Sequence, residues 1–319
     1  MSKSLRFVLL AAVAVAMAWF LIAFTRCGGT TRGSTNVSTS NPPQPPKSSH
    51  VVVVLLENAS YSQVIGNSAM PYLNSLANQY ALATSYFADA HPSLPDYFVL
   101  TAGQTVTSGD AFSGTVSDDN IVRELNRAGR SWKVYAESLP SVGYMGSDVR
   151  PYIRHHNPFV YFSDVANDAA QQQNVVPFTQ FALDLGSGSL PNYSFVVPNE
   201  FDDAHSCPSS NPSCTDNDKL AAADRWLQSN IDPLLSNAAF ANDGLLMIVY
   251  DESLSSDTQS GGGHIAAVLA GPVVKPGFKS TTIYQHASTL RMTLKRLGVT
   301  NYPGNAASAP EMDEFFTSP

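Results

Sequence analysis

Two pairs of oxygen-bearing side chains each follow a run of apolar residues. Glu57 and Asn58 come directly after six apolar residues, and Asp251 and Glu252 come directly after six more. Such runs are typical of strands that are buried on both faces in a parallel sheet. Because the carboxyl ends of parallel strands meet at one edge of a sheet, the two pairs are expected to bring four oxygen donors together. Carboxylates crowded in this way repel one another unless a cation neutralises them, so the pattern predicts a metal site.

Ser93 is the candidate nucleophile. It lies in the segment His-Pro-Ser-Leu-Pro at positions 91–95, and Pro95 suits the first turn of a helix. Ser93 would then sit at the amino terminus of that helix, where free N–H groups and the helix dipole attract anions and lower the pKa of a hydroxyl. The simpler alternative is that Ser93, like Asn58 after the first strand, only caps a helix.

A third group of polar side chains follows the apolar run at residues 193–197. This group contains Asn199, Asp203 and His205. Their place after another predicted strand puts them at the same edge of the sheet, where open α/β sheets bind ligands. The alternative is a structural or calcium-binding acidic turn.

Two further histidines are candidates for the same site. Three glycines precede His264, and glycines permit a close approach of the backbone that favours a place in the site. The alternative for His264 is a histidine at a strand end that is bonded to a backbone carbonyl. His155 and His156 are adjacent, and neighbouring side chains of an extended segment point in opposite directions. We therefore expect at most one of them to enter the site.

The order of apolar and polar segments predicts the fold class. Strands and helices alternate along the chain, which is typical of a right-handed, parallel α/β protein. The expected strands are at residues 51–56, 81–87, 132–135, 193–197, 245–250 and 265–270. The expected helices start near residues 71 and 93–95 and span 119–129, 220–231 and 286–298.

Composition and the two ends of the chain indicate the compartment in which the protein acts and the boundaries of its folded domain. The chain has 319 residues, a formal net charge of −8 and no run of Lys or Arg, which argues against a nucleic-acid partner. Residues 1–26 have the basic start and apolar stretch of an export signal or an uncleaved anchor. Residues 27–48, rich in Ser, Thr and Pro, are expected to form a flexible tether. Residues 49–300 would form the folded domain and residues 301–319 a polar tail.

Two of the three cysteines are close in sequence. Cys207 and Cys214 follow the polar group after residue 197. In a chain that acts outside the cytoplasm, in the periplasm or at the cell surface, a disulfide between them is the natural expectation. A zinc site is the alternative, but the sequence has no second Cys or His pair at ligand spacing.

The order and spacing of these segments resemble the bacterial phosphoesterase family, which holds acid phosphatases and phospholipases C and belongs to the alkaline phosphatase superfamily. The resemblance covers roughly residues 49–298. The segments that carry it are Glu57-Asn58, residues 91–95, Asp202-Asp203-Ala204-His205, Asp251-Glu252 and Gly263-His264.

The resemblance implies a three-layer α/β/α sandwich with a mostly parallel central sheet, and one divalent metal ion of undetermined identity. The implied metal ligands are Glu57, Asn58, Ser93, Asp251 and Glu252. The implied proton-transfer residues are His205 and His264, and the implied substrate contacts are Asn199, Asp203 and His156. Two positions depart from the family pattern. Asp96 stands where Asn is expected, and Glu252 has a longer reach than the second Asp of a late Asp pair.

The expected function is that of an exported, acid phosphatase-like phosphomonoesterase that works through a phosphoserine intermediate. One alternative is a phosphodiesterase of the phospholipase C type, which we rank lower because the chain ends soon after its last predicted core helix. A less favoured alternative is a tethered, non-enzymatic calcium-binding protein. The expected partner is a small-molecule or lipid-headgroup phosphate ester, with membrane contact only through the N-terminal segment. The oligomeric state is left open.

Overall fold

The computed structural model describes residues 47–317, so the predicted export signal and almost all of the predicted tether lie outside the described residues. Within residues 47–317, no helix combines the length and the apolar character needed to cross a membrane.

A mixed sheet of eight strands forms the centre of the described part of the chain, in the order β4-β3-β5-β1-β6-β7-β2-β8. The strands are β1 Val51–Leu56, β2 Ala81–Phe87, β3 Trp132–Ala136, β4 Val175–Pro177, β5 Tyr193–Val197, β6 Leu245–Tyr250, β7 His264–Ala270 and β8 Phe278–Ser280. Strand β7 pairs antiparallel with both β6 and β2, whereas the other neighbouring strands run parallel. The expectation of a mostly parallel sheet is therefore confirmed.

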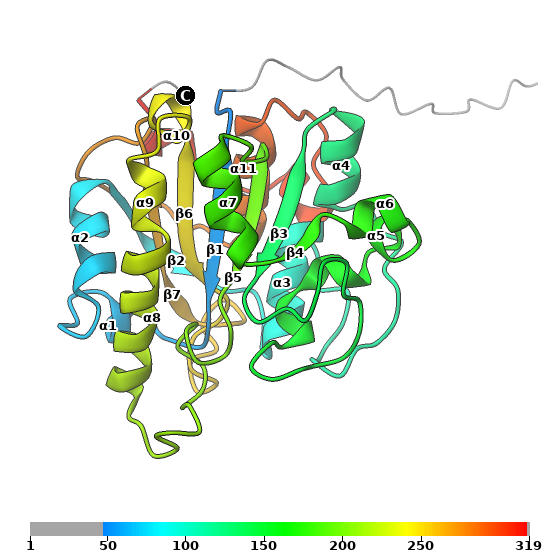
Figure 1. Cartoon of the computed structure of the whole chain (residues 1–319). Helices are drawn as coiled ribbons and strands as arrows, with labels where there is room; N and C mark the ends of the chain where they lie inside the picture. Colours follow the sequence, from blue (N-terminus) through cyan, green and yellow to red (C-terminus); the bar gives the residue numbers. More distant parts are fainter. Residues whose placement is uncertain (1–46, 318–319) are drawn as a thin grey trace, which may run out of the picture. The chain divides into compact units, whose positions relative to one another are not determined.

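Helices cover both faces of the sheet (Figure 1). Helices α2 and α8 pack together on one face, and α3, α4 and α11 pack together on the other. The helices are α1 Tyr61–Val64, α2 Pro71–Gln79, α3 Ser93–Ala102, α4 Ile121–Arg127, α5 Ser163–Ala166, α6 Ala169–Gln172, α7 Thr179–Ser187, α8 Asp216–Asn230, α9 Asp232–Leu235, α10 Phe240–Asp243 and α11 His286–Arg296. Short 3-10 helices are η1 Arg154–His156, η2 Pro158–Tyr161, η3 Gly304–Ala307 and η4 Asp313–Phe315.

The elements next to the predicted site are held by apolar burial. Every residue of β1, β6 and α3 is buried, including the polar residues Ser93, Asp96 and Thr101 of α3. Burying one aliphatic side chain stabilises the folded state by about 1.5–3 kcal/mol, so these elements form a rigid support. Helix α3 ends at Gly103, which adopts a left-handed conformation with φ +73° and lies against the Pro303 carbonyl.

Four strands end at one edge of the sheet. The carboxyl ends of β1, β5 and β6 meet there because these strands are parallel neighbours. Strand β2 ends at the same edge, since it pairs with the antiparallel β7, and Phe87 lies opposite His264. The loops after these strands therefore carry the predicted site residues to one place.

The folded body extends beyond the boundaries predicted from the sequence. Ser48 is fully buried, and its backbone N–H donates to the Arg296 carbonyl at 3.0 Å. At the other end, Met312, Phe315 and Phe316 are buried rather than part of an exposed polar tail. The pattern after residue 300 predicts a polar tail because these apolar side chains are few and lack a regular period.

Candidate active site

Strands β1 and β6 bring the two oxygen-bearing pairs together. They lie side by side in register, with Leu56 opposite Tyr250. Asn58 adopts a left-handed conformation with φ 43°, which Asn tolerates better than most residues. This turn lets its backbone N–H donate to Asp251 Oδ1 at 3.0 Å and its side-chain amide donate to Glu252 Oε1 at 2.5 Å. The structure thus confirms that the pairs meet, whereas the metal-ligand role of these residues stays a prediction.

Ser93 is the first residue of α3, and its hydroxyl faces the same cluster. Its Oγ lies 3.1 Å from Glu57 Oε2 and 3.4 Å from Glu252 Oε1. Tyr97 follows one helical turn later, and its hydroxyl donates to Glu57 Oε1. Tyr97 is not among the residues predicted from the sequence, although its spacing of four residues from Ser93 on a helix was a usable signal.

A buried triad adjoins Ser93. The backbone N–H of Glu57 donates to the Asp203 carbonyl at 2.8 Å, which ties the loop after β5 to the end of β1. His156 lies between the two carboxylates, with Nε2 3.4 Å from Glu57 Oε1 and Nδ1 3.4 Å from Asp203 Oδ2. One potential ligand atom from each of the three residues lies within 4.8 Å of the others. The structure therefore contains a buried group able to hold a metal ion, and it includes Asp203 and His156, which the sequence predicts as substrate contacts instead.

The donor atoms of this cluster fit a divalent cation. Within residues 47–317, His156 Nε2, Asp203 Oδ2 and Asp251 Oδ2 are buried and have no hydrogen-bond partner. Buried polar atoms without partners carry a large desolvation cost. Carboxylate oxygens and an imidazole nitrogen are ordinary ligands of divalent transition metals. A cation bound there would satisfy the unpaired atoms.

The pKa shifts of the cluster also favour a bound cation. Burial, together with the charges of Asp251 and Asp203, raises the pKa of Glu57 well above its usual value. Burial also raises the pKa of Asp203, and burial and the Asp251 charge raise the pKa of Glu252 to about 7. Burial lowers the pKa of His156 well below its usual value. Without a cation, this edge favours neutral carboxyl groups and a neutral imidazole.

His91 supports Glu252 and was not predicted as a site residue. Its Nδ1 is in close contact with Glu252 Oε2, and its Nε2 is 2.9 Å from the Asp257 carbonyl. Glu252 is therefore held by His91 on one oxygen and by Asn58 on the other. These contacts accommodate the longer side chain of Glu252. In the sequence, the position of His91 two residues before Ser93 could have identified it as a site residue.

The Asp96 carboxyl group is not exposed in the space beside Ser93. It is buried, and its Oδ1 accepts from the backbone N–H groups of Asp89 at 2.7 Å and Ala90 at 3.1 Å. Burial raises its pKa well above the usual value. Asp96 thus holds the loop that leads into Ser93. On the same side, His286 Nε2 lies 2.6 Å from the Asp251 carbonyl, where an N–H would fix the turn after β6.

Asn199 and His205 lie in the loop after β5. The Asn199 side chain is bonded within this loop, to Phe201 N at 2.9 Å and to Asp202 Oδ2 at 3.1 Å. The His205 ring lies 5.9 Å from the His156 ring, so it borders the triad. Desolvation by the surrounding loop lowers the pKa of His205, although the residue is exposed. His205 is placed where it could reach a substrate, whereas Asn199 shapes the loop.

The structure does not bring the His264 ring to the Ser93 cluster. Its Nε2 is 3.0 Å from the Thr84 carbonyl, and the ring stacks on Tyr61 and Phe87 at centroid distances of 4.4 and 4.9 Å. This is the contact with a backbone carbonyl that was the alternative for His264. The preceding glycines do allow a close approach: a Cβ at Gly262 would lie 2.3 Å from the Ala90 carbonyl oxygen. Their effect is to pack this loop against the segment before Ser93.

Cys207 and Cys214 form the expected disulfide. It closes a short loop that begins two residues after His205. Replacing both cysteines with serine is expected to lower the free energy of unfolding by about 2 kcal/mol, because the bond restricts the unfolded chain. Urea denaturation of the oxidised full chain measures this, with Cys27→Ser as the matched control. An unchanged midpoint in the double variant would contradict a stabilising role.

Comparison with solved structures identifies the type of fold. A protein of the alkaline phosphatase superfamily from Vibrio parahaemolyticus superposes with a TM-score of 0.59 at 14% identity, covering 82% of this chain and 70% of that chain. The lipoteichoic acid synthase LtaP from Listeria monocytogenes gives 0.55 at 12% identity, covering 84% of this chain and 74% of that chain. The fold is thus of the alkaline phosphatase type.

The family follows from sequence. The model of the phosphoesterase family matches residues 66–300, and the chain belongs to this family of hydrolases. It is 33% identical over 273 residues to a phosphatidylinositol-3-phosphatase of Mycobacterium tuberculosis, covering 85% of this chain and 84% of the relative. It is also 33% identical over 226 residues to a phosphate-repressible acid phosphatase of Penicillium chrysogenum, covering 68% of this chain and 52% of that relative. The chain therefore spans about half the length of the fungal relative.

Proposed function

We propose that the protein is a metal-dependent phosphomonoesterase in which Ser93 is the nucleophile. The observation that carries this proposal is the position of Ser93 Oγ at the start of α3, within 3.4 Å of carboxylates from both the β1 and β6 loops. A hydroxyl at a helix amino terminus beside potential proton acceptors suits attack on a phosphoryl group. The acid phosphatase and phosphatidylinositol-3-phosphatase relatives support monoester substrates.

The residues that would hold the metal come from several loops at one edge of the sheet. Glu57, Asn58, Asp251, Glu252 and Ser93 are the ligands expected from the family, and the structure adds Asp203 and His156 as candidates. When bound, a divalent cation would lower the pKa of a coordinated hydroxyl and offset negative charge on phosphoryl oxygens. The unpaired, buried oxygen atoms of Asp203 and Asp251 support its presence in the working enzyme.

This chain's own residues would carry out two chemical steps. Ser93 Oγ attacks phosphorus and passes its proton to Glu57 or Glu252, while the bond between phosphorus and the leaving alcohol oxygen breaks. His205, which borders the triad, gives a proton to that leaving oxygen. Water then attacks the phosphoserine on phosphorus and gives a proton to His205, while the bond between Ser93 Oγ and phosphorus breaks. Ser93 Oγ takes its proton back from Glu57 or Glu252, and inorganic phosphate is released. We assign the acid to His205 rather than His264 because the His264 ring is bonded to the Thr84 carbonyl.

Hydrolysis of paired model substrates tests the monoester assignment. The full chain, treated with chelator and resupplied with single divalent metals, is expected to hydrolyse p-nitrophenyl phosphate faster than p-nitrophenyl phosphocholine. The reverse order would favour a phospholipase C type diesterase. Metal binding without turnover of either substrate in folded protein would instead favour the non-enzymatic, calcium-binding alternative.

We further propose that the enzyme is exported and acts in the periplasm or at the cell surface. The basic and apolar start of the sequence and the disulfide between Cys207 and Cys214 support this. Phosphate esters of small molecules or lipid head groups are the proposed substrates. Fusing the first 48 residues to a reporter that is active only outside the cytoplasm tests the location, and an inactive reporter would contradict export.

A further inference from the structure

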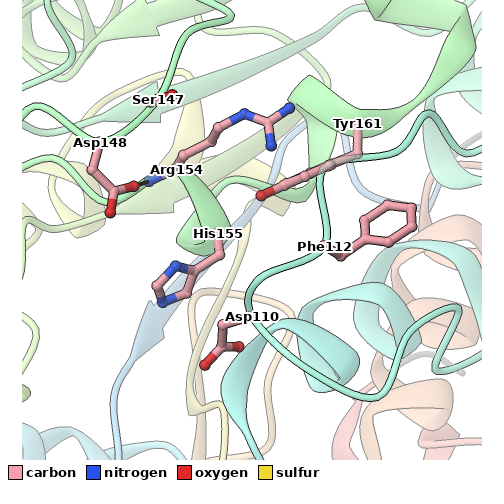
Figure 2. Close-up of a pocket in the computed structure, with 7 residues that line it drawn as sticks. All are labelled: Asp110, Phe112, Ser147, Asp148, Arg154, His155 and Tyr161. Carbon is pink, nitrogen blue, oxygen red and sulfur yellow. Dashed lines mark hydrogen bonds between the residues drawn. The ribbon is translucent and has the colours of Figure 1, made fainter.

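A polar pocket lies beside the Ser93 cluster. It has a volume of about 270 Å³, and its walls include the side chains Asp110, Phe112, Asp148, Arg154, His155 and Tyr161. Figure 2 shows these side chains around one space, with Arg154 between Asp148 and Tyr161 and with His155 and Asp110 below them. The steps proposed above use none of these residues.

Two contacts connect this pocket to the predicted nucleophile. Asp110 Oδ1 accepts from the backbone N–H of Leu94, the residue after Ser93, at 2.9 Å. The His155 ring packs edge-on against the His156 ring of the triad, at a centroid distance of 4.7 Å. The pocket therefore lies close enough to receive the part of a substrate that extends from a phosphate held at Ser93.

The rings of Tyr161 and Phe112 hold the Arg154 guanidinium, the positively charged group of the pocket, in place. The Arg154 guanidinium lies 3.9 Å from the centroid of the Tyr161 ring, and Phe112 packs against Tyr161 at 5.7 Å. The Arg154 backbone N–H donates to Asp148 Oδ1 at 2.8 Å. Within residues 47–317, the Arg154 guanidinium forms a side-chain hydrogen bond with Tyr161 and no salt bridge with a carboxylate. Tyr161 thus orients the planar set of N–H donors, and the donors that it does not use face the pocket.

The pocket offers hydrogen-bond acceptors as well as donors. Asp110 and Asp148 each use Oδ1 for a backbone N–H, which leaves Oδ2 available to accept from a hydroxyl group. Arg154 supplies donors, and the Tyr161 and Phe112 rings supply an apolar surface. Two carboxylates against one guanidinium make the walls unfavourable for a second phosphate. Acceptors, donors and an aromatic face together match a ring that carries several hydroxyl groups.

We propose that this pocket binds the leaving group of the substrate and selects a polyhydroxylated ring, such as a sugar or cyclitol, that carries a single phosphate. This inference rests on the proposed phosphomonoesterase activity and names its substrate class. Asp148 and Arg154 determine specificity by contacting the ring hydroxyls. They take no part in the bond-breaking step.

Matched substrates test the proposal with the full, metal-loaded chain. Inositol monophosphate and cyclohexyl phosphate have the same carbon ring, but only the first carries free hydroxyls. We expect kcat/KM to be about 10-fold or more higher for inositol monophosphate, since each lost hydrogen bond to a charged group lowers affinity substantially. Inositol bisphosphate with a second ring phosphate should be a poorer substrate than the monophosphate.

Variants identify the pocket as the source of that preference. Asp148→Asn and Arg154→Gln should each lower kcat/KM for inositol monophosphate by about 10-fold, with only small changes for p-nitrophenyl phosphate and cyclohexyl phosphate. The amide oxygen introduced by Asp148→Asn would still accept from the Arg154 backbone N–H, so the fold should persist. Asp118→Asn, the same charge change at an exposed position, is the matched control and should alter nothing. Thermal melting confirms that each variant is folded.

The outcomes separate this proposal from the proposed function. Turnover of p-nitrophenyl phosphate with equal kcat/KM for the inositol and cyclohexyl esters would overturn only the pocket assignment. A preference for the bisphosphate would overturn it in favour of a second anion site. Equal loss on all substrates in both folded variants would also overturn it. Absence of any monoester turnover with every metal would overturn the proposed function and this inference together.

Discussion

Ser93→Ala is expected to lower kcat/KM for p-nitrophenyl phosphate by about 10⁴-fold or more, because removal of a nucleophile leaves only positioning and electrostatic effects. Ser93 begins α3, and its Oγ is the group that lies 3.1 Å from Glu57 Oε2. The side chain of alanine fits the same buried position, since only one oxygen atom is lost. The variant should therefore remain folded while turnover disappears.

The control for this experiment is another buried serine. Ser288 lies in α11, is 1% exposed and has a hydroxyl without a hydrogen-bond partner within residues 47–317. Ser288→Ala should leave kcat/KM within about twofold, since it removes no hydrogen bond. Thermal melting of both variants separates loss of catalysis from loss of folding. A folded Ser93→Ala protein that keeps a few per cent of the activity would refute the nucleophile assignment.

Chelation of divalent cations is expected to abolish turnover and to make stability fall as the pH rises. In the metal-free protein, burial and neighbouring carboxylates raise the pKa values of Glu57, Asp203 and Glu252, the last to about 7. A carboxyl whose pKa is higher in the folded than in the unfolded state binds its proton more tightly when folded. It stabilises the protein below the unfolded-state pKa, and that contribution is lost as pH rises through the folded-state pKa.

The measurable result is a melting temperature that is lower at about pH 8.5 than at about pH 7 in the presence of chelator, a range in which the buried histidines, His156 among them, are neutral in both the folded and the unfolded state. A chain of this size should shift by about 2–4 °C for each kcal/mol of stability lost. A saturating divalent cation should raise the melting temperature most at the higher pH, because it binds the ionised carboxylates of the folded state. Activity should return with the same cation.

Two variants locate this effect in the cluster. Glu57→Gln should weaken both the pH dependence in chelator and the response to added metal, because it removes one buried carboxylate. Glu311→Gln is the control: Glu311 pairs with Lys295 and Arg291, which lower its pKa to about 2. Its replacement should leave the metal response intact. A metal-free protein that is more stable at the higher pH would contradict the assignment of the cluster as a metal site.

Local sequence patterns were enough to place the strands of the site and the points where they end. The apolar runs before Glu57 and Asp251, and the polar residues that follow residue 197, are patterns of neighbouring residues that can be recognised without knowledge of the fold. The segment that begins at His91 likewise placed Ser93 at the start of a helix. These features indicated an α/β protein, and their resemblance to the phosphoesterase family indicated the class; the fold and family comparisons confirm both.

Which side chains face one another depended on how distant strands pack. Strand β1 lies between β5 and β6, which are far from it in sequence, and this order sets Asp203 after β5 beside Glu57. The 3-10 helix η1 packs against α3 and brings His156 between these two residues. The same order leaves His264 at the start of the antiparallel β7, where its ring Nε2–H donates to the Thr84 carbonyl. Such contacts depend on strand order and loop paths across the whole sheet, and no local pattern encodes them. The sequence alone therefore indicated the edge of the sheet at which the site lies. The packing of distant strands determined which side chains form the site.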